Sequence, residues 1–219
     1  MPPGTGRVER VSVSERPGRR YRGMSAADRD ADRRRRLVAA GMQAFGTDGY
    51  AATTIEGLCR AAGIAARNFY DHFASREALL AAVYDEVVAA HTEQLVAALS
   101  AEPEDLERHV RSGLDAAVRG WAADERHARI ALVEVVGVGP AMEAHRLAVI
   151  RGYAALLAAD GERLAERGLV SRPPGPLVAM ALVGALTQIL TDWQHRPAER
   201  APIEDVVDAL SRVYVAALA

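Results

Sequence analysis

The N-terminal third of this chain is organised around one stretch, TTIEGLCRAAGIAARNFYDHF, which spans residues 53–73. Thr53 or Thr54 is suited to cap a short helix with apolar side chains on one face. Ala62-Gly63-Ile64 interrupts that helix, and its glycine supplies the backbone freedom that a tight turn requires. A second short helix is predicted from about residue 66 to residue 73. Two short helices joined in this way predict a helix-turn-helix, which places its second helix in the major groove of DNA.

The predicted second helix begins with side chains that can read bases. Arg67 and Asn68 lie in its first turn, and Asn68 is the only asparagine in the chain. Arginine and asparagine bind the major-groove edges of guanine and adenine with paired hydrogen bonds. This pattern indicates a sequence-specific contact with DNA.

The stretch from Arg33 to Val88 resembles the N-terminal domain of the TetR family of transcriptional regulators. The matching segments are Ala44-Phe45 with Gly49-Tyr50, Thr53-Thr54-Ile55, Ala62-Gly63-Ile64, Phe69-Tyr70-Asp71-His72-Phe73 and Ser75-Arg76-Glu77-Ala78-Leu79. The resemblance in sequence covers about the first 90 residues. It implies a DNA-binding regulator, most often a repressor, that binds a palindromic operator as a homodimer and is released by a small-molecule effector.

The resemblance also implies which residues meet the DNA. Thr53, Thr54 and Arg76 correspond to phosphate anchors, Arg67 and Asn68 to base readers, and Tyr70 and His72 to backbone contacts. Ala65 stands where family members usually have a serine or threonine that caps the recognition helix. The full set of candidate DNA-binding residues is Thr53, Thr54, Ala65, Ala66, Arg67, Asn68, Tyr70, His72 and Arg76.

Charge is distributed unevenly along the chain. Residues 1–76 hold 14 arginines and 8 acidic residues, a net of +6, and residues 77–219 hold 13 arginines and 21 acidic residues, a net of −8. Such asymmetry favours a polyanionic partner for the first third only. Residues 1–28 lack periodicity and are predicted to be a disordered basic arm, which could follow the DNA, be inert, or precede a true start at Met24.

The rest of the chain follows the periodicity of helices. Pro103 stands where a helix would begin, and Pro140 to Arg167 is predicted to be one long helix. Residues 130–136, IALVEVV, fit either a helix or a buried strand; helix is preferred because no second strand is available to pair with it. The sequence predicts an all-α fold of about nine helices, with an N-terminal three-helix domain that contains the helix-turn-helix and a C-terminal helical bundle. The predicted domain boundaries give a disordered arm at 1–28, a DNA-binding domain at 29–78 and an effector-binding and dimerisation domain at 79–219.

The C-terminal bundle is expected to hold the effector and the dimer interface. Residues 177–190, LVAMALVGALTQIL, are apolar around the whole helix and must be buried on more than one side, which favours a homodimer through 176–193 and 202–218. The candidate ligand-binding residues are polar or adaptable side chains within apolar helices. They are Trp121, His127, Glu134, Met142, His145, Tyr153 and Gln188.

Other classes of function are disfavoured. One cysteine, Cys59, excludes an internal disulfide and a cysteine-based zinc site. No phosphate loop, GxSxG elbow or HExxH motif is present, so an all-helical enzyme is only the alternative, as is a DNA-binding protein without an effector. No metal, cofactor, secretion signal or membrane span is expected, and the protein is expected to be cytoplasmic.

Overall fold

The computed structural model of the chain describes residues 25–102 and 104–218. The predicted basic arm therefore lies outside the described residues, except for its last four positions. Pro103, at the predicted start of a helix, also lies outside them.

The all-α prediction is confirmed for the part of the chain that the structure describes, which contains no strand. Eight α-helices are connected by turns and by three short helical segments, two of 3₁₀ type (η1 and η3) and one π-helical (η2). In chain order the elements are α1 (Ala26–Thr47), α2 (Ile55–Ala62), η1 (Ala66–Asn68), α3 (Arg76–Leu99), α4 (Leu106–Ala122), α5 (Glu125–Arg129), η2 (Ile130–Glu134), α6 (Pro140–Glu166), α7 (Pro176–His195), η3 (Pro197–Glu199) and α8 (Ile203–Leu218).

Two elements differ from the sequence prediction. The second helix of the helix-turn-helix, predicted over residues 66–73, is the single 3₁₀ turn η1 followed by further turns, so eight α-helices form instead of nine. Most of the ambiguous segment at residues 130–136 is helical, as preferred, but it continues α5 as the π-helical turn η2 over Ile130–Glu134 and then leaves the helix. The apolar pattern is the same for these geometries, and the tertiary packing selects among them.

Helix α1 begins at a capping box formed by Ser25 and Asp28. The Ser25 hydroxyl accepts a hydrogen bond from the Asp28 N–H at 3.0 Å, and the Asp28 carboxylate accepts one from the Ser25 N–H at 3.1 Å. This capping box satisfies two backbone donors at the helix start. The helix therefore starts at Ala26, within a stretch that composition assigns to the arm.

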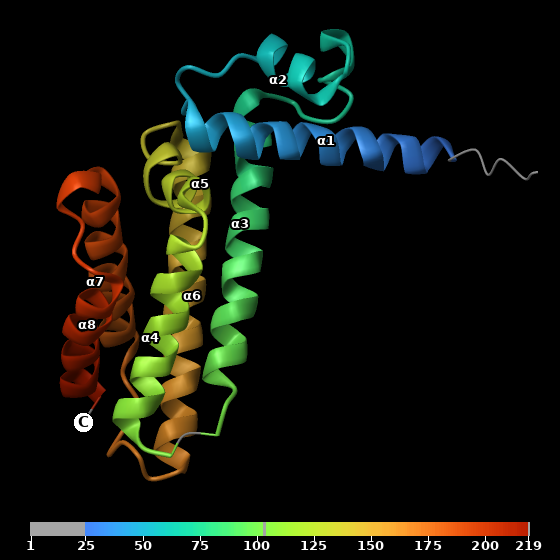
Figure 1. Cartoon of the computed structure of the whole chain (residues 1–219). Helices are drawn as coiled ribbons and strands as arrows, with labels where there is room; N and C mark the ends of the chain where they lie inside the picture. The colour runs from blue at the N-terminus through green and yellow to red at the C-terminus, as the bar shows by residue number, and fades with distance from the viewer. Residues whose placement is uncertain (1–24, 103, 219) are drawn as a thin grey trace, which may run out of the picture.

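The helices form two layers of different orientation. Figure 1 shows α1 lying across one end of the bundle, with α2 and the helix-turn-helix beyond it. Helix α3 begins beside α2 and continues into the bundle next to α4 and α6, and α7 with α8 covers one flank. The predicted boundary at residue 78 falls in the first turn of α3, which thus belongs to both layers.

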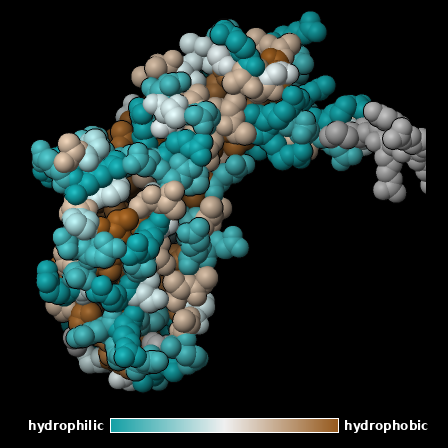
Figure 2. All heavy atoms as spheres, in the orientation of Figure 1, coloured by the Kyte–Doolittle hydropathy of each residue, from teal (hydrophilic) through white to brown (hydrophobic). Residues whose placement is uncertain are grey.

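The core consists mostly of aliphatic side chains that join the two layers. Phe45, Leu79 and Leu80 are fully buried where α1 crosses α3, and Ile130 of η2 is fully buried nearby. The face in Figure 2 is largely hydrophilic, with hydrophobic atoms in patches over the bundle. The N-terminal layer is therefore packed directly on the bundle.

Candidate nucleic-acid interface and ligand cavity

The turn of the helix-turn-helix is built as its sequence predicts. The Thr54 hydroxyl caps α2 by accepting a hydrogen bond from the Gly57 N–H at 3.1 Å. Gly63 ends α2 with a φ of +64°, a left-handed conformation that favours glycine. The Ile64 N–H then bonds the Cys59 carbonyl at 2.9 Å, so the chain leaves α2 in a fixed direction.

The start of η1 presents its side chains to solvent. Ala65 stands at the N-cap position with no side-chain cap, and Ala65, Ala66 and Arg67 are exposed. Asn68 is half-buried and Tyr70 is 64% exposed. Phe69 and Phe73 alternate with these residues and are buried, so they hold the turn against the core.

Three of the predicted DNA contacts have other partners in this structure. Thr53 is buried and its hydroxyl donates to the Gly49 carbonyl at 2.8 Å. The His72 side chain is only 2% exposed and lies 3.6 Å from the Asp30 carboxylate. The Arg76 guanidinium lies 4.1 Å from the centre of the Tyr50 ring and donates to the Thr53 carbonyl. These three side chains are enclosed where α1 packs against the turn, and their contacts there stabilise the fold.

The arginine run at residues 33–36 is also partly engaged within the protein. Arg36 donates to the Ala62 carbonyl at 3.1 Å and pairs with Asp32 at 3.1 Å. The Arg34 guanidinium lies 4.8 Å from the centre of the Phe73 ring. The run therefore fastens α1 to the helix-turn-helix while part of each guanidinium remains near the surface.

A carboxylate of η2 connects the bundle to the N-terminal layer. Glu134 accepts a hydrogen bond from the Tyr50 N–H at 2.7 Å and one from Arg129 Nε at 2.8 Å. Glu77, in the first turn of α3, accepts a further bond from the Met142 N–H of α6 at 3.1 Å. These hydrogen bonds connect the N-terminal layer to the bundle.

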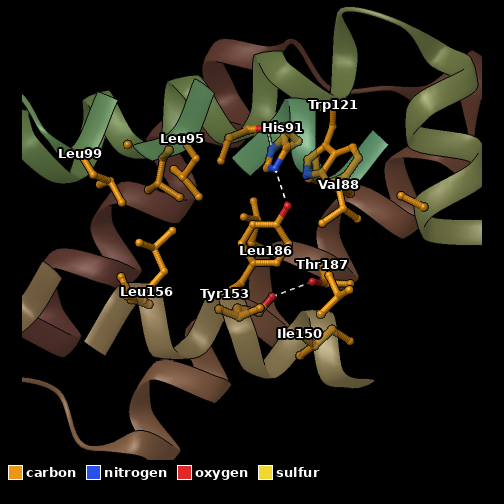
Figure 3. Close-up of a pocket in the computed structure, with 18 of the residues that line it drawn as sticks. Val88, His91, Leu95, Leu99, Trp121, Ile150, Tyr153, Leu156, Leu186 and Thr187 are labelled. Carbon is orange, nitrogen blue, oxygen red and sulfur yellow. Dashed lines mark hydrogen bonds between the residues drawn. The ribbon is translucent and has the colours of Figure 1, made fainter. Parts of the chain in front are cut away.

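An elongated cavity runs through the bundle between α3, α4, α6 and α7. Its empty volume is about 1040 Å³, part of which is open to solvent. It follows α3 from Tyr84 to Leu99, a distance of about 22 Å along the helix axis. Figure 3 shows leucine, valine and isoleucine side chains along its walls. The cavity is mostly apolar, as is typical of sites for organic ligands.

One polar cluster lies halfway along this cavity. His91 Nδ1 is 3.0 Å from the Tyr153 hydroxyl, and the two side chains approach each other from opposite walls (Figure 3). The Trp121 ring stacks on the His91 ring with 3.9 Å between centroids, and Thr92 donates to the Tyr153 hydroxyl at 3.1 Å. Burial lowers the pKa of His91 to about 4 and raises the pKa of Tyr153, so both are neutral near pH 7.

A second polar cluster closes the end of the cavity that lies farther from the N-terminal layer. His109 Nε2 lies 2.9 Å from an Asp160 oxygen, and Arg163 donates to the other oxygen. Burial alone would raise the pKa of Asp160, but the bonds from His109 and Arg163 outweigh it and hold that pKa below its ordinary value. Asp160 is therefore a buried carboxylate with its charge compensated.

Two of the seven predicted ligand residues, Trp121 and Tyr153, line the cavity. The other five do not: Glu134 and Met142 lie at the layer junction, His127 beside Asp124, His145 beside Asp85, and Gln188 on the exposed face of α7. The cavity lining also includes five polar residues that the sequence pattern did not single out: His91, His109, Arg146, Asp160 and Thr187. For His91 on α3 and His109 on α4, a polar residue within an otherwise apolar helix face was the available indication. Which of such residues face the cavity depends on how each helix is rotated by packing.

The outer face of α7 is apolar and uncovered in the single chain. Leu177 is 86% exposed, and Ala181, Gly184 and Gln188 continue the same stripe at helical spacing. On α8, Val213 is 52% exposed between Ala209 and Ala216. Among the described helices, α7 alone is long and apolar enough to cross a membrane by length and composition, with 22% of its most apolar window buried. One such helix is weak evidence for a membrane span, because the core helix of a soluble protein meets the same criterion.

Comparisons with known proteins agree with this geometry. Residues 37–83 match the family model described as bacterial regulatory proteins, tetR family. A search among curated proteins found no significant match.

Solved structures share the fold at low sequence identity. The FadR regulator from Bacillus subtilis in complex with stearoyl-CoA is 14% identical, with a TM-score of 0.72 and coverage of 84% of this chain and 99% of that one. FadR from Bacillus halodurans, a fatty acid degradation regulator, is 19% identical, with a TM-score of 0.71 and coverage of 83% and 93%. PfmR from Thermus thermophilus, a TetR family transcriptional regulator, is 21% identical, with a TM-score of 0.63 and coverage of 84% and 99%.

The matched residues 37–83 contain the whole helix-turn-helix, with its capped α2, its glycine turn and its exposed Arg67. Residues 37–83 thus form a DNA-binding domain of the TetR type, and the chain as a whole shares its fold with transcriptional regulators of that family.

Proposed function

We propose that this regulator is a repressor that binds a palindromic operator as a homodimer and is released when a small molecule occupies the bundle cavity. The observation that carries the proposal is the path of α3. This helix begins at Arg76, beside the helix-turn-helix, and one face of it between Tyr84 and Leu99 lines the cavity. A ligand that changes the position of α3 in the bundle would also change the position of the DNA-binding domain.

Base reading is assigned to the exposed start of η1. Arg67 and Asn68 are the base readers, Tyr70 is a backbone contact, and Thr54 at the start of α2 is the phosphate anchor that remains accessible. We assign residues 29–78 to DNA binding and 79–219 to effector binding and dimerisation. A chromosomal operator also implies a cytoplasmic location.

The homodimer is assigned to the outer faces of α7 and α8. An apolar stripe with Leu177 86% exposed loses contact with water when a second copy covers it. A twofold interface would place the two N-terminal layers on successive half-sites of a palindrome.

A glycine pair tests this interface. A Cβ added at Gly184 on α7 or at Gly152 on α6 meets no atom within 4 Å in the single chain. We expect Gly184→Asp to give monomers and Gly152→Asp to leave dimers, as measured by analytical ultracentrifugation. Dimers of both variants would place the interface elsewhere.

The effector is expected to be a molecule with a long aliphatic part. The cavity walls are mostly aliphatic, and the similar fold of FadR was solved with stearoyl-CoA bound. Fragments of the native genome selected by the protein would supply the operator. Release of that operator by a cavity ligand would support the proposal, and retention of DNA by ligand-bound protein would favour a regulator without an effector.

The coupling has to be reciprocal. A ligand that releases DNA must bind the DNA-incompetent arrangement more tightly, so operator DNA must weaken ligand binding by the same factor. Titration calorimetry with and without operator measures this factor, and a cavity ligand whose affinity is identical in both titrations would rule out the mechanism for that ligand.

A further inference from the structure

The hydrogen atoms of the central polar cluster have fixed positions. His91 Nε2 lies 3.0 Å from the Ala117 carbonyl oxygen, which can only accept, so Nε2 carries the hydrogen. His91 is neutral near pH 7 because burial lowers its pKa to about 4. Its Nδ1 is consequently a lone pair, and the stacked ring of Trp121 keeps the imidazole in this orientation.

The Tyr153 hydroxyl is therefore turned into an acceptor toward the cavity. Its hydrogen is donated to His91 Nδ1 at 3.0 Å, and one of its lone pairs accepts the Thr92 hydroxyl at 3.1 Å. A phenol has one hydrogen and two lone pairs, so one lone pair of the oxygen stays available. The hydroxyl can accept a further hydrogen bond but has no hydrogen left to donate.

The wall formed by α7 also presents a hydrogen-bond acceptor to the cavity. The Thr187 hydroxyl of α7 donates its hydrogen to the Val183 carbonyl at 2.8 Å, which leaves lone pairs. Arg146, which also lines the cavity, binds both oxygens of Glu143, at 3.0 Å and 2.8 Å. An incoming carboxylate would thus find acceptors in the middle of the cavity and an arginine whose charge is already compensated.

We propose that the cavity binds an uncharged, elongated aliphatic molecule whose hydroxyl or amide N–H donates a hydrogen bond to the Tyr153 hydroxyl oxygen. This inference rests on the proposed effector site and names the chemistry of its ligand. Tyr153 contacts the ligand directly, and His91 is a positioning residue that fixes the polarity of the Tyr153 hydroxyl. Tyr153 lies about 10 Å from both Arg146 and Asp160 along α6, which places the donor near the middle of the molecule.

Three matched probes test the inference on the full chain without DNA. They are 6-undecanol, which can donate a hydrogen bond, 6-undecanone, which can only accept, and undecane, which can do neither. A ketone oxygen would face the lone pairs of Tyr153 and Thr187 and remain unpaired. We expect isothermal titration calorimetry to show the alcohol binding roughly tenfold more tightly than the ketone.

Variants of the cluster separate this role from a merely structural one. His91→Phe keeps a ring against Trp121 but frees the Tyr153 hydrogen, so the ketone should gain affinity and the preference should fall to unity or invert. Tyr153→Phe leaves the Thr92 hydrogen free for a ketone and should also reduce the preference to about unity. His127→Phe, on α5 outside the cavity, is the control and should keep the preference of the wild type.

Each outcome decides between the proposals. A wild-type protein that binds alcohol and ketone equally, or folded His91→Phe protein with an unchanged preference, overturns the inference while the effector site stands. If none of the three probes binds the wild-type protein, the effector site itself fails. If His91→Phe does not fold by circular dichroism, Tyr153→Phe decides: a retained preference overturns the inference, and a lost preference supports it.

Discussion

The N-terminal layer and the bundle keep their polar side chains in different places. In the N-terminal layer, arginines lie at the surface or pack against the turn, and the buried Thr53 hydroxyl donates to a carbonyl four residues away. In the bundle, His91, His109 and Asp160 are buried, and all three line the cavity. Burying a polar side chain costs free energy of desolvation, which its hydrogen bonds must offset. The polar clusters of the bundle therefore depend on their partners.

The two regions should therefore respond differently to substitution. A surface that meets a polyanion depends on exposed side chains that contribute little to folding. A cavity with buried polar walls depends on the same groups for stability and for ligand selection. Substitutions should consequently separate binding from stability in the N-terminal layer and affect both in the bundle.

The largest effect is expected from the buried carboxylate. Asp160→Ala removes the partner of His109 and Arg163 and should lower the free energy of unfolding by about 3 kcal/mol, as measured by urea denaturation. Asp208→Ala removes an exposed pair with Arg111 and should cost less than about 1 kcal/mol. Equal losses from the two substitutions would contradict the contrast between buried and exposed charges.

A smaller effect is expected from the titration of His91. Its folded pKa, about 4, lies below its ordinary value of 6.5, so the unfolded chain binds the proton first as the pH falls. Stability is therefore lost as the pH falls from 6.5 toward 4, by about 2 kcal/mol between pH 7 and pH 5. His91→Phe should lack this part of the pH dependence in thermal or urea unfolding. An identical pH profile for both proteins would show that His91 is not buried and neutral.

Base reading should be separable from stability. Arg67→Ala should weaken operator binding about tenfold and relax the preference at one position of each half-site, with an unchanged melting temperature. Arg76→Ala should lower the melting temperature instead, because Arg76 packs on Tyr50 and bonds the Thr53 carbonyl. Fluorescence anisotropy and calorimetry measure the two effects. A loss of specificity with Arg76→Ala and none with Arg67→Ala would reverse these roles.

The smallest effect concerns the uncapped start of η1. Ala65→Ser supplies a hydroxyl that can accept an orphan N–H at the N-cap position and should raise the free energy of unfolding by less than about 1 kcal/mol. Ala66→Ser adds a hydroxyl one position later and should not stabilise. A decrease for Ala65→Ser in thermal unfolding would mean that no backbone donor is available there.

The helix-turn-helix was predictable from sequence because its determinants are local. The Thr54 cap, the left-handed Gly63 and the alternation of Phe69 and Phe73 with exposed residues all depend on neighbours within a few positions. The choice of 3₁₀ turns over an α-helix after Ala65 was not predictable, because both geometries bury the same phenylalanines. The contacts of His72 with Asp30 and of Thr53 with the Gly49 carbonyl were not predictable from the pattern, because they depend on how α1 packs and on the path of the turn before α2.

Local sequence patterns predict the all-α fold, the position of the helix-turn-helix and the apolar character of α7. Periodicity, capping residues and glycine are sufficient for these features because they act over one or two turns of chain. Which polar side chains share the cavity depends on how the helices pack against one another. His91, Tyr153 and Trp121 come from three helices that are distant in sequence, and a rotation of any one helix by a single residue, about 100°, would turn its side chain out of the cluster.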